Sequence, residues 1–147
     1  MSKRIMLKAT IGVFCLALAM GCATSGGAKK EAKATADPKV EITKVVGDWG
    51  GALATKDIEK IMAYYSDAFK DGEGRDKAAL KDFIKGAIDA GYLDGAKVNV
   101  AAAQVAVTGD QATVSPISLS GSMGEISLSL TLKKEAAGWH IVGSSQA

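Results

Sequence analysis

Residues 125–134 read Glu-Ile-Ser-Leu-Ser-Leu-Thr-Leu-Lys-Lys, in which apolar and polar side chains alternate. A period of two is typical of a β-strand with one face in the core, because successive side chains of a strand point to opposite faces. The stretch therefore predicts a sheet that is covered on one side only. Its expected core face comprises Ile126, Leu128, Leu130 and Leu132, and its expected outer face comprises Ser127, Ser129, Thr131 and Lys133.

Turn signals on both sides of this stretch predict an antiparallel meander. Gly109-Asp110 is a hairpin signal, and glycine-containing turns at 121–124 and 136–138 separate the other alternating runs. The predicted strands are 97–108, with a bulge within 101–103, then 111–120, 125–134 and 139–144.

Upstream of residue 92 the apolar period is helical. Asp37-Pro38 starts a first helix that Gly50-Gly51 should weaken at its end, Thr55 can cap a second helix, and Asp76 can cap a third that stops near Gly91. Helices followed by a meander predict an α+β fold, with three N-terminal helices packed on a strongly curved antiparallel sheet. The expected buried stripes are Val40, Ile42, Val45, Val46, Trp49 and Leu53; Ile58, Ile61, Met62 and Tyr65; and Leu80, Phe83, Ile84, Ala87 and Ile88.

Three segments together carry a family resemblance. They are Asp57-Ile58 with Tyr64-Tyr65-Ser66-Asp67-Ala68-Phe69, the stretch at 107–114, and the closing stretch at 132–141. In order and spacing they resemble the nuclear transport factor 2-like superfamily, which includes SnoaL-like polyketide cyclases. The resemblance implies a cone-shaped domain over residues 38–147 with a pocket inside. It implies no single activity, because this fold hosts isomerases, dehydratases, cyclases and non-catalytic binding modules.

The N-terminus predicts export and lipidation. Residues 1–21 combine a basic start with an apolar run of about a dozen residues, shorter than the roughly 20 that a spanning helix needs. Leu18-Ala19-Met20-Gly21-Cys22 resembles a bacterial lipobox, so Cys22 is expected to carry the lipid. Residues 22–37 lack large apolar side chains and predict a flexible tether.

Charge and cysteine content exclude several kinds of function. The chain has a net charge of +2, but removal of Lys3, Arg4 and Lys8 with the signal leaves 15 basic against 16 acidic side chains. Nucleic-acid binding thus has no electrostatic support. No cysteine follows Cys22, so disulfides and cysteine-ligated metals are not expected, and no motif predicts another metal or a cofactor.

The polar candidates for a site lie at the predicted end of the second helix, and Trp49 of the first helix is a further candidate for the pocket lining. Tyr64 and Asp67 are weak candidates for an acid/base pair, while Trp49, Tyr64, Tyr65 and Phe69 are candidates for the pocket lining. The only histidine, His140, alternates out of phase with Trp139 and Ile141 and should face away from them.

The resulting hypothesis is a non-catalytic lipoprotein, anchored at Cys22, whose cone binds a small apolar ligand or a partner protein. One alternative is a dehydratase- or isomerase-type enzyme that uses Tyr64 and Asp67. Another is an envelope assembly subunit, or a homodimer, that uses the serine-rich sheet face. The residue after Cys22 is Ala23 and not the aspartate that, by resemblance to enterobacterial lipoproteins, would retain the protein in the inner membrane. The outer membrane is therefore favoured in a cell that has one.

Overall fold

The computed structural model describes residues 36–147. The signal peptide, Cys22 and nearly all of the tether lie outside the described residues, so their assignments stay predictions. Within 36–147, no helix combines the length and the apolar character needed to cross a membrane.

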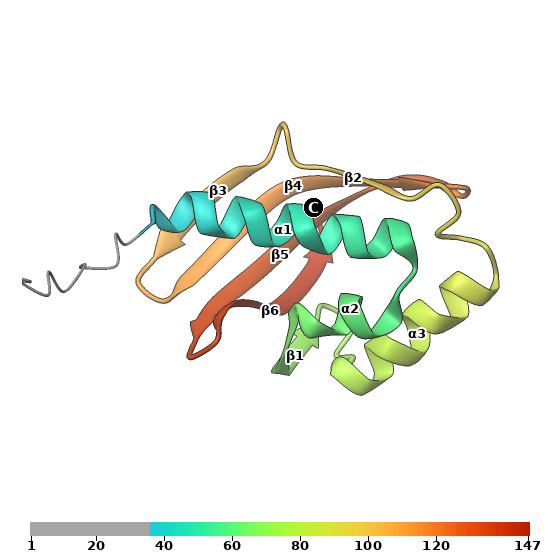
Figure 1. Ribbon diagram of the computed structural model, residues 1–147, viewed down its shortest axis with the longest axis horizontal. Helices are drawn as coiled ribbons and strands as arrows, with labels where there is room; N and C mark the ends of the chain where they lie inside the picture. Colours follow the sequence, from blue (N-terminus) through green and yellow to red (C-terminus); the bar gives the residue numbers. More distant parts are fainter. Residues whose placement is uncertain (1–35) are drawn as a thin grey trace, which may run out of the picture. The chain divides into compact units, whose positions relative to one another are not determined.

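The described residues form three helices on one face of a six-stranded sheet (Figure 1). The strand order is β1-β6-β5-β4-β2, and β3 also pairs with β4. This α+β arrangement confirms the predicted fold class. The elements are α1 (Pro38–Thr55), α2 (Ile58–Ala63), β1 (Tyr65–Asp71), α3 (Lys77–Asp89), β2 (Lys97–Asn99), β3 (Gln104–Thr108), β4 (Gln111–Gly121), β5 (Gly124–Glu135) and β6 (Gly138–Gln146).

The alternating stretch is the centre of strand β5, as predicted. Its apolar residues pair across strand β4, with Leu132 opposite Ala112, Leu130 opposite Val114 and Ile126 opposite Leu119. Leu132 and Leu130 are fully buried, whereas Ile126 is 46% exposed. One face of the strand therefore runs from a closed core to an open end.

Strand β1 corrects the sequence prediction. Helix α2 ends at Ala63 and is capped by Asp57, not Thr55, and the chain then turns into a strand that pairs in parallel with β6. The sheet is thus mixed and not wholly antiparallel. The error has a physical cause: Tyr65 and Phe69 are both buried, and a spacing of four residues fits one face of a helix as well as one face of a strand.

The predicted long strand at 97–108 is also interrupted. Strands β2 and β3 both pair with β4, but residues 100–103 between them leave the ladder. The gap lies opposite Pro116, where the pairing of β4 with β5 also shifts register. Proline has no N–H to donate to a neighbouring strand, which explains the break. Such irregularities bend strands and so help to curve a sheet.

Helix α1 runs through Gly50-Gly51, the pair that we expected to weaken its end. A Cβ atom at Gly50 would lie 2.6 Å from the Cβ of Val98 in strand β2, closer than two carbon atoms can approach. A Cβ at Gly51 would meet nothing within 4 Å. Gly50 is therefore the position that lets the helix lie directly on the edge of the sheet.

This contact predicts opposite effects for two neighbouring substitutions. Gly50→Ala should lower the free energy of unfolding by about 1–3 kcal/mol, because helix and strand must separate. Gly51→Ala should raise it by about 0.5–1 kcal/mol, because alanine favours the helix. Urea denaturation measures both values. Equal stabilisation by the two substitutions would contradict the close packing of α1 on β2.

Candidate ligand-binding cavity

A cavity of about 570 Å³ lies between helix α3 and the sheet. Trp49 and Leu53 of helix α1 line it on one side, and Ile84 of helix α3 lines it on another. Leu128 and Leu130 come from the alternating strand β5 and form the inner wall. The residues that define the sheet therefore also supply the apolar surface of the cavity.

Helix α3 lies over this cavity, and a polar contact marks each of its ends. At its start, the Asp76 carboxylate accepts a hydrogen bond of 2.9 Å from the Ala79 N–H, as expected for an N-cap. Just beyond its end, the Ser122 hydroxyl in the β4–β5 turn donates a hydrogen bond of 2.8 Å to the Gly91 carbonyl. The main packing contacts of α3 are with strand β1 and helix α2 and not with the centre of the sheet.

Phe83 is exposed, although it was predicted to be buried, because helix α3 does not pack on the centre of the sheet. Leu80 and Ile84 are buried as expected, but Phe83, which we placed in the same buried stripe, is 55% exposed. A helix that lies across the centre of a sheet would cover such a side chain. Helix α3 lies toward the edge strand, so Phe83 projects beside the cavity opening.

Tyr65 and Trp49 form the polar contact in the cavity wall. The Trp49 indole N–H donates a hydrogen bond of 3.1 Å to the Tyr65 hydroxyl, and both residues line the cavity. The Tyr65 ring packs edge-to-face on Phe69, with ring centres 4.9 Å apart. Burial raises the pKa of Tyr65, so the hydroxyl stays neutral at physiological pH and contributes no charge to the cavity.

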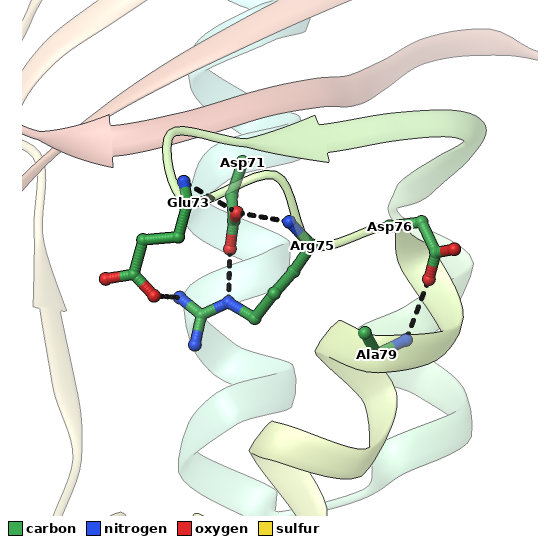
Figure 2. A network of polar contacts seen from close by, with 5 residues as sticks. All are labelled: Asp71, Glu73, Arg75, Asp76 and Ala79. Atoms are coloured by element: carbon green, nitrogen blue, oxygen red, sulfur yellow. Dashed lines mark hydrogen bonds and ion pairs between the residues drawn. The ribbon is translucent and has the colours of Figure 1, made fainter.

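A charged network closes one end of the cavity in the turn between β1 and α3 (Figure 2). The Asp71 carboxylate accepts hydrogen bonds from the Glu73 N–H at 3.0 Å, the Arg75 N–H at 2.8 Å and the Arg75 Nε at 2.6 Å. A second guanidinium nitrogen of Arg75 lies 2.9 Å from the Glu73 carboxylate. Burial acts to raise the pKa of Asp71, but the hydrogen bonds from Arg75 and Glu73 outweigh it and hold that pKa below its usual range.

A second hollow of about 560 Å³ continues the apolar surface outward. We call it the mouth groove and define it by Phe83, Tyr92, Met123 and Ile126, which are 55%, 49%, 71% and 46% exposed. Phe83 and Ile126 line the cavity as well as the groove. Large apolar side chains gathered around an opening are typical of a binding surface.

The predicted site residues divide between the cavity and other places. Trp49 and Tyr65 line the cavity, whereas Tyr64 and Phe69 do not. Phe69 is a fully buried core residue beneath Tyr65. Tyr64 follows helix α2, is half-buried against the core and accepts a backbone hydrogen bond from the Ile141 N–H.

The expected pair of Tyr64 and Asp67 is not formed in the described residues. The side chain of Asp67 is 99% exposed and pairs with Lys77 at 2.8 Å. That ion pair lowers the pKa of Asp67. The two residues were expected on one helix end, but Asp67 lies on β1, which directs it into a shallow groove between α2 and α3. An ionised, solvated carboxylate at this position has no access to the cavity.

His140 lies on the face of strand β6 opposite to Trp139 and Ile141, as its phase predicts. Its Nδ1 is 3.3 Å from the Glu135 carboxylate, which also accepts a hydrogen bond of 2.6 Å from the buried Ser66 hydroxyl. These contacts connect β1 to the β5–β6 hairpin on the outer side of the sheet, away from the cavity.

The serine-rich face lies on that same outer side. Ser118 pairs with Ser127 across β4 and β5. The described helices all lie on the other face (Figure 1). A contact between two copies through this face stays a prediction.

Sequence reasoning missed Arg75 and Phe83 as parts of the candidate site. A signal for Arg75 was present, because Asp71-Gly72-Glu73-Gly74-Arg75 is a turn sequence in which an aspartate can accept bonds from the following backbone. Phe83 carried no such signal, because its spacing matches a core position.

Comparison with solved structures supports the fold. A protein of unknown function with a cystatin-like fold from Nostoc punctiforme is 17% identical, with a TM-score of 0.60 over 72% of this chain and 86% of that one. Nuclear transport factor 2-like proteins of unknown function match similarly. The one from Pseudomonas putida is 16% identical, with a TM-score of 0.60 over 74% of this chain and 85% of that one. The one from Shewanella baltica is 17% identical, with a TM-score of 0.57 over 72% and 89%. No family model and no curated protein matches the sequence. The fold is thus that of nuclear transport factor 2-like proteins, as the sequence motifs predict.

The Asp71 network predicts a stability that depends on pH. Asp71→Asn should lower the free energy of unfolding at pH 7 by about 1–3 kcal/mol, because it removes a charged acceptor from three donors. A carboxylate with a lowered folded-state pKa stabilises the fold above its unfolded pKa of about 4 and loses this contribution as pH falls through the folded value. The difference in free energy of unfolding between the wild-type protein and Asp71→Asn should therefore become smaller below about pH 4.

Urea denaturation at a series of pH values measures this difference. The control is Asp89→Asn at the end of helix α3, where an exposed carboxylate forms no ion pair in the described residues. This substitution should change the free energy of unfolding by less than about 0.5 kcal/mol. If the free energies of unfolding of Asp71→Asn and the wild-type protein differ by the same amount from pH 7 to pH 3, the ionised Asp71 carboxylate does not stabilise the fold.

Proposed function

We propose that this chain is an exported lipoprotein, anchored at Cys22, whose cone-shaped domain binds a small, largely apolar molecule without transforming it. The observation that carries the proposal is the cavity beneath helix α3. Its volume of about 570 Å³ lies in the range of about 300–1,000 Å³ that is usual for small-molecule sites.

The chemistry of the cavity wall favours binding over catalysis. Acid/base catalysis needs a titratable group within hydrogen-bond reach of the substrate. Asp71 and Arg75 already pair with each other, and the Tyr65 hydroxyl is held by Trp49. Asp67 is outside the cavity and ionised. These residues thus hold the cavity in shape and leave its surface mainly apolar.

The mouth groove supports entry from solvent. Phe83 and Ile126 line both the groove and the cavity, so an elongated molecule can follow one apolar surface from the outside inward. Burial of apolar surface contributes about 25 cal/mol per Å², so contact with this surface is the expected main source of affinity.

Filling the cavity should abolish binding. The neutral dye N-phenyl-1-naphthylamine, whose fluorescence rises in apolar surroundings, should bind the wild-type protein saturably. Ala87 of helix α3 lines both the cavity and the groove. Ala87→Phe should weaken dye binding at least tenfold, a change of about 1.4 kcal/mol, because the ring occupies the same space.

The matched control is Ala79→Phe, an exposed position on the same helix that lines neither hollow. It should leave the dye affinity unchanged. Saturable binding that survives Ala87→Phe, in a variant that keeps the wild-type circular dichroism, would refute the cavity as the binding site.

The anchor is tested separately. Cys22→Ser removes the thiol that lipidation requires, and the substitution lies outside residues 36–147. We expect the variant to leave the membrane fraction, because an acyl chain contributes about 0.8 kcal/mol of membrane affinity per buried methylene group. Cell fractionation with immunodetection measures this. Unchanged membrane association of Cys22→Ser would contradict the lipoprotein assignment.

A further inference from the structure

The charged residues around the cavity and the mouth groove are mostly acidic. Asp71, Glu73 and Arg75 lie at the cavity, and Asp82 lies at the groove. These are three carboxylates and one guanidinium, and no lysine lines either hollow. The charged side chains that line the two hollows therefore sum to a net negative charge, and Asp82 is the charged residue that lines the mouth groove.

The single cation is not free to hold an anion. The Arg75 guanidinium donates to Asp71 at 2.6 Å and pairs with Glu73 at 2.9 Å. It also lies 4.3 Å from the centre of the Phe83 ring. An anionic head group at the opening would have to displace these partners, and would lie among carboxylates.

Asp82, in contrast, is available. It is exposed on helix α3, lines the mouth groove and forms no ion pair with another residue of the described chain. Lys81, next to it in sequence, pairs with Glu59 at 2.6 Å, and Lys85 lines neither hollow. Tyr92, half exposed in the same groove, adds an aromatic ring. A carboxylate together with an aromatic ring is a favourable environment for an ammonium group.

We propose that the ligand of this cavity is a cationic amphiphile, with its apolar chain in the cavity and its ammonium group in the mouth groove beside Asp82. This inference rests on the proposed function, which it deepens by naming the class of ligand. Charge complementarity at the opening selects the head group, and the apolar wall formed by Leu128 and Leu130 accepts the chain.

The test compares three amphiphiles that share a twelve-carbon chain: dodecyltrimethylammonium, dodecyl maltoside and dodecanoate. Each displaces N-phenyl-1-naphthylamine from the full-length protein carrying Cys22→Ser, below its micelle concentration and at low salt. The cation should bind about five- to tenfold more tightly than the anion, as expected for exposed charges a few ångströms apart. High salt should reduce that preference.

Asp82→Asn should remove most of the preference for the cation and leave the affinity for dodecyl maltoside unchanged. Asp89→Asn, on the same helix but lining neither hollow, should leave all three affinities unchanged.

Equal binding of the three amphiphiles, or tighter binding of dodecanoate, would overturn the inference while the cavity still binds apolar chains. A preference for the cation that survives Asp82→Asn would also overturn it. If neither the dye nor any amphiphile binds, the proposed function itself is wrong, and the inference fails with it.

Discussion

The pairing of strands β4 and β5 is the constraint on which the rest of this domain depends. Because side chains alternate along a strand, the register that places Leu130 opposite Val114 also assigns every other residue of both strands to a face. A shift by one residue would turn Leu128, Leu130 and Leu132 outward. That register therefore determines both where the core is and which residues face the cavity.

The two long helices use the resulting surface differently. Helix α1 lies so close to the edge of the sheet that only a glycine fits against Val98, and it behaves as part of the core. Helix α3 packs mainly on strand β1 and helix α2, and past its end the Ser122 hydroxyl donates a hydrogen bond to the Gly91 carbonyl. The cavity exists because helix α3 does not pack on the sheet as directly as helix α1 does.

Much of this could be predicted from local sequence, and the failures share a cause. Strand β5, the three helix regions and the Asp76 cap follow from periodicity and capping, which act between residues close in the chain. Strand β1 could not be separated from a helix end, because Tyr65 and Phe69 satisfy both periods. Phe83 could not be recognised as exposed, because its environment depends on how far α3 stands from strands that follow it in sequence. The position of Asp67 follows from the same ambiguity, because its side chain changes direction when a helix end becomes a strand.

The position of helix α3 also bears on how such a protein can change over generations. Val114 and Ile117 of strand β4 are buried in the core and line neither hollow, whereas Ala87 and Asp82 of helix α3 line the groove. Under the proposed function, replacements on that surface would alter which molecules are accepted while the strand ladder stays intact. The outer groove can therefore vary without disturbing the strand ladder, whereas the inner wall of Leu128 and Leu130 serves the fold and the cavity at once and is far less free to change.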